Sequence, residues 1–463
     1  MYQLYYQPEG VWVGDIMPYG ENGTFYIYHQ RDTRNPGPFG EPFGWALAST
    51  KDFVHYEDFG ESLKRGTEEE PDQFIYAGSV FRVGQEYQAF YTGYNREYLK
   101  VGLVSQTLLH AVSKDKVHWK KSLRTLEIAP QEGYDKRNWR DPFVVFDEEN
   151  QEYILILGAR KGEDKRKQTG RLVWFTSKDL EHWEFKGDFW SPGLYTMFEM
   201  PELFQIGDWW YLVYSEYSAG NKIHYRMSKN LHGPWMAPND DSFDGRAYYA
   251  GRTAFDGQRR VLFGWVPTRI GNDDKNAYLW GGTFVPHEIV QRPDGTLAVK
   301  PPDTLWNVFT SWENIFCSDM KTIDIREETV VFSKMGDATA FETTCSFSEG
   351  TKAFSIKFYE DRENGVAYEY VFLIGENRVV FQKSPNYPWY QCFNIGLERP
   401  ILLQPEKPYQ IRLIVDHDIA VLYVNGTALC ARLCDRPGDS IALTVTDGEL
   451  KTEYTRASVS FRQ

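Results

Sequence analysis

Five stretches of the chain are nearly continuous in aromatic and β-branched residues, and each follows turn-forming residues such as Asn22-Gly23 or Asp256-Gly257. Runs of this kind are typical of strands that are buried on both faces. They span residues 24–29, 87–92, 153–158, 210–215 and 260–265. No amphipathic helix of ordinary length is indicated before residue 310. Spacings of roughly 50–66 residues between the runs predict five four-stranded blades, that is, a five-bladed β-propeller.

A short polar motif of the form S-x-D-x-x-H-aromatic accompanies these runs. Four variants of it begin at residues 49, 113, 177 and 228, so their spacings are 64, 64 and 51 residues. A period of this size in a strand-rich chain indicates repeated sheets. We interpret the motif as a turn between the outer strands of each blade, and its value lies in the period that it reveals.

The pattern changes after Pro301-Pro302-Asp303, where short alternating strands separated by polar turns take over. These strands are expected at residues 329–332, 353–358, 379–381, 411–416, 420–426 and 440–445. Regular short strands without helices predict a β-sandwich. The expected fold class is therefore all-β, with a propeller over residues 1–303, a linker over 304–314 and a C-terminal β-sandwich over 315–463.

Charge and composition restrict the partners. The chain carries 51 basic and 65 acidic residues, a net charge of −14 that would repel a nucleic-acid backbone. The sequence contains no run of 18 apolar residues, so no membrane span is expected. The first residues lack the basic and apolar regions of a signal peptide, so we expect a cytoplasmic location unless a leader has been removed. The five cysteines show no metal-type spacing and are expected to be reduced thiols. Nothing in the sequence indicates an oligomeric state.

Three carboxylates, Asp15, Asp141 and Glu199, each stand just upstream of an apolar strand. Equivalent positions of successive blades face the same mouth of a propeller channel, so we expect these side chains to converge. Carboxylates that lie close together repel, and one keeps a proton while another stays ionised. Cleavage of a glycosidic bond needs this combination. Glu202, which follows in the same strand as Glu199, is expected either as a further acid or as a hydrogen-bonding residue.

These residues lie in short motifs whose order resembles glycoside hydrolase family 32, the β-fructofuranosidases (invertase, inulinase and levanase). The resemblance covers almost the whole chain. The R-D-P motif is intact as Arg140-Asp141-Pro142, and the E-C-P motif corresponds to Glu199-Met200-Pro201. The other similar segments are residues 12–18 (W-M-N-D-P-N-G), 43–56 (W-G-H-A with the following S-x-D motif), 76–79 (F-S-G-S), 249–255 (Y-A-x-x-x-F), 264–265 (G-W), 281–289 (G-G-x-L-x-x-P-R-E-L) and, in the sandwich, 414–425.

The resemblance implies a role for each acid. Asp15 would attack the anomeric carbon of fructose and form a covalent fructosyl intermediate, with the two reacting carboxyl groups about 5–5.5 Å apart. Glu199 would act first as general acid and then as general base. Asp141 would bind fructose hydroxyls and stabilise the transition state. The implied substrate-binding residues are Arg140, Gln30, Trp45, Phe43, Ser79 and Tyr249. The implied partner is a small carbohydrate, and neither a metal nor a cofactor is required.

Three positions depart from the family pattern. Gly14 replaces an asparagine that helps to hold the sugar, Met200 replaces a cysteine beside the acid, and His287 replaces an arginine. These departures affect the choice of fructoside more than the type of reaction. We expect a retaining hydrolase that releases fructose from sucrose, fructo-oligosaccharides or fructans. The alternatives are a propeller glycosidase for another furanoside, a fructosyltransferase and a non-catalytic fructan-binding propeller.

Overall fold

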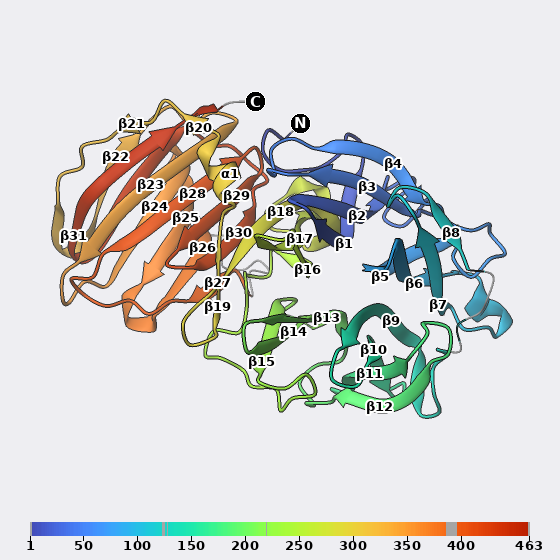
Figure 1. Ribbon diagram of the computed structural model, residues 1–463. Coiled ribbons are helices and arrows are strands. Elements are labelled where there is room, and N and C mark those ends of the chain that lie inside the picture. Colours follow the sequence, from blue (N-terminus) through green and yellow to red (C-terminus); the bar gives the residue numbers. More distant parts are fainter. Residues whose placement is uncertain (1, 123–125, 127, 219, 386–395, 462–463) are drawn as a thin grey trace.

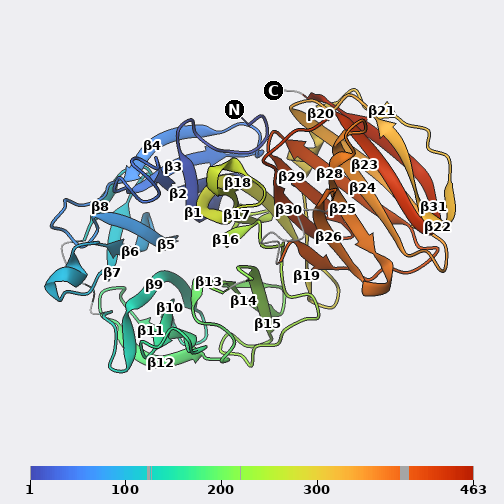
Figure 2. The same cartoon turned by 180° about the vertical axis from the view of Figure 1, so that it is seen from behind.

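The computed structural model describes residues 2–122, 126, 128–218, 220–385 and 396–461. These residues form two parts that lie side by side, a ring of strand groups from the N-terminal part of the chain and a stack of strands from the C-terminal part (Figures 1 and 2). The predicted all-β fold, a five-bladed propeller followed by a sandwich, is confirmed. No helix within these ranges is long and apolar enough to cross a membrane.

The blades follow one another around the ring in chain order (Figure 1). Blade I contains β1 (Trp12–Glu21), β2 (Thr24–Asp32), β3 (Trp45–Thr50) and β4 (Glu57–Leu63). Blade II contains β5 (Phe74–Val83), β6 (Glu86–Tyr94), β7 (Gln106–Ser113) and β8 (Trp119–Lys121). Blade III contains β9 (Tyr134–Asp147), β10 (Glu152–Lys161), β11 (Gly170–Ser177) and β12 (Glu184–Trp190). Within the described residues, blade IV pairs three strands, not the predicted four: β13 (Phe198–Ile206), β14 (Trp209–Glu216) and β15 (Ile223–Ser228). Blade V contains β16 (Tyr249–Phe255), β17 (Arg260–Arg269), β18 (Tyr278–Gln291) and β19 (Leu297–Lys300). The short 3-10 helices η1 (Tyr98–Val101) and η2 (Ile270–Asn272) lie in loops.

The first strand of each blade lies next to the first strands of the neighbouring blades. Contacts run from β1 to β5, β9, β13 and β16 in turn, and from β16 back to β1. Strand β1 also pairs with β18 at Val13 and Gly282, which joins blades I and V into one continuous sheet. The ring is thereby closed, and the five first strands surround its channel.

The apolar runs predicted from the sequence are the second strands of the blades, β2, β6, β10, β14 and β17. Strand β2 shows why they are apolar on both faces. Phe25 contacts Phe263 of blade V with ring centroids 5.4 Å apart. Tyr28, three positions further along the strand, contacts Trp119 of blade II on the other face, with ring centroids 5.7 Å apart. Each blade is thus covered on both faces by adjacent blades, and polar side chains on these strands would lose their water.

The repeated S-x-D motif forms the turn between the third and fourth strands, as predicted. In the first copy, Asp52 Oδ1 accepts hydrogen bonds from the backbone N–H groups of Val54 (2.9 Å) and His55 (2.8 Å). Its other oxygen contacts the His55 ring at 2.7 Å. Asp115 and Asp179 make the same set of contacts in blades II and III. These aspartates therefore serve the turns and lie away from the channel.

Helix α1 (Asp303–Asn307) and the short strands β20 (Phe309–Thr310) and β21 (Glu313–Asn314) occupy the stretch predicted as a linker. The sandwich that follows contains β22 (Met320–Phe332), β23 (Ala338–Phe347), β24 (Ala353–Asp361), β25 (Val366–Leu373), η3 (Ile374–Glu376), β26 (Arg378–Ser384), β27 (Glu398–Pro400), β28 (Tyr409–Asp416), β29 (Ile419–Val424), β30 (Thr427–Arg432), β31 (Ser440–Ser458) and β32 (Ser460–Phe461). The long strand β31 pairs with β24 through its first half and with β23 through its second half, so it belongs to both layers.

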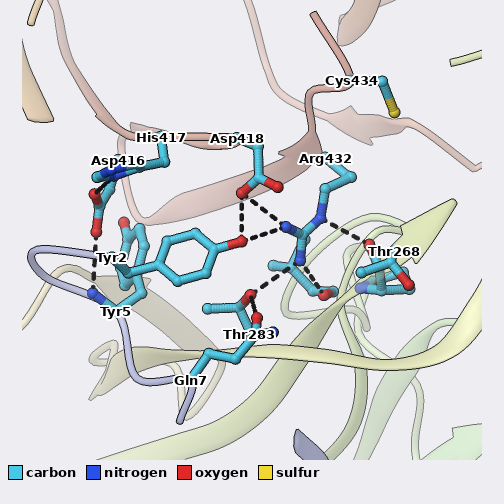
Figure 3. Close-up of polar contacts among 12 residues, drawn as sticks. Tyr2, Tyr5, Gln7, Thr268, Thr283, Asp416, His417, Asp418, Arg432 and Cys434 are labelled. Carbon is cyan, nitrogen blue, oxygen red and sulfur yellow. Dashed lines mark hydrogen bonds and ion pairs between the residues drawn. The ribbon is translucent and has the colours of Figure 1, made fainter. Parts of the chain in front are cut away.

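The N-terminal segment fastens the propeller to the sandwich (Figure 3). Asp416 of the sandwich accepts hydrogen bonds from the backbone N–H groups of Gln3, Leu4 and Tyr5. Arg432, also from the sandwich and 1% exposed, donates to two backbone carbonyls of β17 at 2.8 and 3.0 Å. Buried charged groups of this kind are stable only when their hydrogen-bonding capacity is met. The two parts therefore form one packed unit.

Candidate active site

The five channel-lining strands share a local irregularity. The register of each first strand against the second shifts at corresponding places, which are Val13–Ile16 in β1, Ile75–Gly78 in β5, Arg140–Phe143 in β9, Glu199–Glu202 in β13 and Tyr249–Arg252 in β16. Asp141, Met200 and Ala250 have positive φ angles at these bulges. A β-bulge inserts a residue and re-aims the side chains beside it. The same type of β-bulge therefore turns the candidate residues of four blades toward the channel.

The three carboxylates singled out in the sequence line a single cavity of about 940 Å³. Asp15 comes from β1, Asp141 from β9 and Glu199 from β13, and Gln30 and Arg140 line the same cavity. A smaller cavity of about 210 Å³ adjoins it, and Asp15 and Glu199 line both. The structure thus brings together residues that are up to 184 positions apart in the chain (199 − 15).

Glu199 is held from two sides. The Arg140 guanidinium donates to Oε1 from Nη2 (2.7 Å) and Nε (3.2 Å). The Tyr249 hydroxyl donates to Oε2 at 2.5 Å. The Arg140 side chain is only 13% exposed, so this charge-assisted pair is shielded from water. The carboxyl group of Glu199 therefore has a fixed orientation at the junction of the two cavities.

Asp15 is a carboxyl group in an environment that disfavours its charge. Burial, together with the nearby carboxylates of Asp141 and Glu199, raises the pKa of Asp15 to about 8. Trp265 Nε1 donates to Oδ1 at 3.3 Å. The Gln30 amide, in the orientation that satisfies both of its neighbours, donates to Oδ2 at 3.3 Å. These two hydrogen bonds favour the ionised form of Asp15, but they offset only part of the rise in pKa that burial causes.

Asp141 is the most enclosed of the three acids, with 3% of its surface exposed. Its Oδ2 accepts a hydrogen bond from the backbone N–H of Met200 at 3.0 Å. Burial raises the pKa of Asp141, the Arg140 charge opposes this rise, and the Glu199 charge adds to it. Asp141 therefore links the bulge of blade III to the bulge of blade IV.

The remaining predicted binding residues divide into two groups. Tyr249 lines the smaller cavity and bonds Glu199. Phe43, Trp45 and Ser79 line neither cavity. Trp45 is fully buried, with its indole N–H donating to the Tyr76 carbonyl at 2.9 Å. Ser79 Oγ accepts from the Val144 N–H at 3.3 Å. The polar groups of Trp45 and Ser79 are thus used in joining strands. The expectation that the three side chains contact sugar stays a prediction.

Glu202 has the hydrogen-bonding role that was one of its two expected roles. It is 1% exposed, and its carboxylate accepts from the Thr253 N–H at 2.6 Å and from the Thr253 hydroxyl at 2.5 Å. Arg260 lies 3.8 Å away. Glu202 therefore ties blade IV to blade V below the site and does not line either cavity.

Trp280 is one of the site residues that the sequence interpretation missed. It lines both cavities and stacks on Phe43 with an angle of 6° between the rings. Its indole occupies the space beside Gly14, where any side chain on residue 14 would collide with the ring. A Cβ atom at residue 14 would lie 2.1 Å from Trp280 Cη2. The signal was present in the chain as the unusual Gly14, but the residue that fills its space lies 266 positions away (280 − 14).

Substituting Gly14 with alanine should displace Trp280, because the added methyl group overlaps the indole ring. We expect the unfolding free energy to fall by about 1–3 kcal/mol, the usual cost of overpacking, and KM to rise. Gly37→Ala is the matched control, since a Cβ there meets nothing within 4 Å. Thermal unfolding and steady-state kinetics measure both effects. If Gly14→Ala and the double variant Gly14→Ala/Trp280→Ala were equally destabilised, the proposed collision would be wrong.

A second cluster of chemically capable side chains lies at the interface between the two parts. Among the described residues, Asp244, His287 and Cys430 form the one group of three potential metal ligands within mutual reach, and none lines either cavity. His287 contacts Asp244 at 2.9 Å and the Tyr423 hydroxyl at 2.8 Å. Hydrogen bonds thus account for both of its ring nitrogens. The cysteines within the described ranges are free thiols, as expected, and Cys392 lies outside those ranges.

Comparison with known proteins agrees with this geometry. Over residues 5–301 the chain matches the N-terminal domain of the glycosyl hydrolases family 32. It is 24% identical to a levanase from Bacillus subtilis, over 97% of this chain and 69% of that protein. It is also 24% identical to a sucrose-6-phosphate hydrolase from Vibrio alginolyticus, over 60% of this chain and 58% of that protein.

Solved structures share the complete two-part fold. Fructan 1-exohydrolase IIa from Cichorium intybus superimposes with a TM-score of 0.80 at 15% identity, covering 100% of this chain and 97% of that one. A sucrose-6-phosphate hydrolase from Lactobacillus gasseri gives 0.77 at 18% identity, covering 100% and 93%. The family match spans nearly the whole propeller and contains all three carboxylates. The chain belongs to glycosyl hydrolase family 32.

Proposed function

We propose that the protein hydrolyses β-fructofuranosides by double displacement, with Asp15 as nucleophile and Glu199 as general acid and base. Asp15 attacks the anomeric carbon while Glu199 gives its proton to the departing oxygen, which leaves a fructosyl ester on Asp15. Glu199 then takes a proton from water, which attacks the same carbon and releases fructose. Asp141 and Arg140 hold the sugar hydroxyls. The observation that carries this proposal is the convergence of the three acids and Arg140 on one cavity.

The position of the proton is the least expected property of the site. With a pKa of about 8, Asp15 holds a proton at neutral pH before substrate binds. The first chemical step needs the opposite arrangement, an ionised Asp15 and a protonated Glu199. Asp15 therefore has to lose its proton before it can attack.

The raised pKa of Asp15 predicts an acidic limb in the dependence of kcat/KM on pH. Asp15 and Asp141 both act as carboxylates and both have raised pKa values, so kcat/KM should rise with pH, and the Asp15 value places this limb near pH 8. Initial rates at low substrate concentration across the pH range measure the limb. A limb near the ordinary pKa of an aspartate, about 4, would contradict the raised pKa of Asp15.

Product analysis on a panel of fructosides tests the function itself. The panel contains sucrose, inulin, levan, an aryl arabinofuranoside and a fructosyl acceptor, so that another furanoside or transfer in place of hydrolysis is detected. NMR recorded during turnover identifies the anomer of fructose that is released first. Double displacement requires the anomer with the configuration of the substrate. An inverted first product, or no cleavage of any fructoside, would overturn the proposal.

A phosphorylated fructoside is a second candidate substrate. Arg137 and Lys165 line the larger cavity and are exposed, and within the described ranges neither has a carboxylate at ion-pair distance. Exposed cations of this kind at a cavity mouth attract a phosphate group. Several related proteins are sucrose-6-phosphate hydrolases. Sucrose-6-phosphate is therefore added to the panel, and Lys165→Ala should lower kcat/KM for it without affecting sucrose if this candidate is correct.

A further inference from the structure

Arg252 is a buried charge at the centre of the propeller for which the proposed reaction assigns no role. It lies in β16 and is 1% exposed. Its Nη1 donates to the carbonyl of Gly78 in β5 and to that of Pro142 in β9, the latter at 3.4 Å. Its Nη2 donates to the Asp141 carbonyl at 2.9 Å. The guanidinium thus crosses the channel from blade V and binds the bulged segments of blades II and III.

The backbone of Asp141 needs such support. Asp141 has a φ angle of 64°, a left-handed conformation that is strained for a residue with a side chain. Its N–H donates to the Thr92 hydroxyl at 3.0 Å, and its carbonyl accepts from Arg252. Side chains from blades II and V therefore hold both ends of this residue. Strained conformations persist only where the surroundings fix them in this way.

The charge of Arg252 also faces the acids of the site. Burial lowers the pKa of Arg252 to about 10, although the carboxylates of Asp141, Glu202 and Asp15 all favour its protonated form. At neutral pH it is therefore a cation. The charged groups around it are Asp15 from β1, Arg140 and Asp141 from β9, Glu199 and Glu202 from β13, and Arg260 from β17. Two of the three arginines are engaged by glutamates, Arg140 by Glu199 and Arg260 by Glu202. Arg252 is then the cation whose hydrogen bonds go to the Asp141 segment itself.

We propose that Arg252 is a positioning residue, whose guanidinium holds the Asp141 bulge in place and whose positive charge favours the carboxylate form of Asp141. It contacts backbone carbonyls and lines neither cavity, so it acts on substrate through Asp141. The role deepens the proposed fructosidase function and rests on it for its effect on turnover. Its effect on the ionisation of Asp141 is independent of the substrate.

The kinetic test compares Arg252→Met with Arg252→Lys. The methionine variant loses both the hydrogen bonds of the guanidinium group and its positive charge. We therefore expect kcat to fall about 100-fold and the acidic limb of kcat/KM to move to higher pH by about one unit. The lysine variant keeps the charge and should lower kcat without moving that limb. Arg399→Met is the matched control, because Arg399 is equally buried and bonds the Ala428 carbonyl at 3.0 Å and the Asp240 carboxylate at 2.8 Å, and neither of these residues lines either cavity. It should lose stability with the acidic limb unchanged. An acidic limb of Arg252→Met at the wild-type position would overturn the proposal.

A second measurement needs no substrate and so remains valid if no fructoside is cleaved. A carboxyl group whose pKa is raised by folding destabilises the fold once pH exceeds its unfolded pKa. Loss of the Arg252 charge raises the folded pKa of Asp141 further, so Arg252→Met should lose more stability at about pH 8 than at about pH 5. Arg252→Lys should lose the same amount at both. A pH-independent loss for Arg252→Met would show a merely structural role.

A double-mutant cycle covers the case in which Arg252→Met does not fold. Arg252→Lys and Asp141→Asn are then combined, and kcat is measured for the single and double variants. Because the proposal routes the effect of Arg252 through Asp141, the losses should be strongly non-additive, with Arg252→Lys costing little once Asp141 is replaced. Additive losses would overturn it.

Discussion

Asp15→Asn is expected to abolish turnover of every fructoside, with kcat reduced by about 10⁴-fold or more, because the amide cannot form the fructosyl ester. The same change should leave the fold intact or make it more stable. The pKa of Asp15 is raised to about 8, so ionising this carboxyl group destabilises the folded protein as pH rises from the unfolded pKa toward that value. An amide removes that destabilisation. The stability gain should therefore grow with pH and be fully present above about pH 8.

The measurement combines kinetics with thermal unfolding at acidic and alkaline pH. Asp147→Asn is the control, since Asp147 is a buried carboxylate of the same propeller whose oxygens bond Glu149 and Asn150 in a turn. It should lose stability and keep its activity. Trapping of a fructosyl unit on the peptide that contains Asp15, detected by mass spectrometry after rapid quenching, identifies the nucleophile directly. Retained turnover in Asp15→Asn would sink the assignment.

The propeller could be predicted from the sequence because the patterns that indicate it are local. Each second strand is buried on both faces and so is apolar throughout, and each Ser-Asp turn is specified by a few consecutive residues such as those around Asp52. The acids were found for a related reason. Asp15, Asp141 and Glu199 occupy corresponding bulges in different blades, so a repeat of known period places them together.

The parts that sequence reasoning missed depend on distant side chains. Trp45 is of a residue type that often stacks on sugars, but its indole N–H donates to the Tyr76 carbonyl inside the propeller. Trp280 does line the cavity, because Gly14 leaves room for its indole. No local pattern distinguishes these two tryptophans. Only the arrangement of blade V beside blade I decides which one lines the cavity.

The protonation states of the three acids also could not be predicted from the sequence. The pattern of three acids predicts that one carries a proton, but it does not say which. The structure places Arg140 and the Tyr249 hydroxyl on Glu199, whereas Asp15 receives only uncharged donors from Trp265 and Gln30. Burial and the two neighbouring acids therefore leave Asp15 protonated near neutral pH. In the proposed mechanism this proton has to leave Asp15 before the attack.

Glu199→Gln should separate the two halves of the reaction. The amide cannot donate a catalytic proton, so kcat/KM for sucrose or a fructan should fall about 10³–10⁴-fold, near the upper range for loss of general acid catalysis. An aryl fructoside with a good leaving group needs little protonation, and its fructosylation should fall far less. Loss of the Glu199 charge also removes one cause of the raised pKa of Asp15, so the acidic limb should move to lower pH for the aryl substrate.

Glu202→Gln is the control that distinguishes chemistry from packing. Glu202 lies in the same strand and is buried, but its carboxylate bonds Thr253 and lines neither cavity. Its replacement should lower the unfolding free energy and reduce activity on both substrates by the same factor. Glu199→Gln should instead change the ratio of the two activities, and a small anion such as azide should restore turnover of the aryl fructoside by attacking the fructosyl intermediate without general-base help. If both variants lowered the two activities in equal proportion, Glu199 could not be the proton donor, and the acid would have to be sought among the other groups that line the cavity.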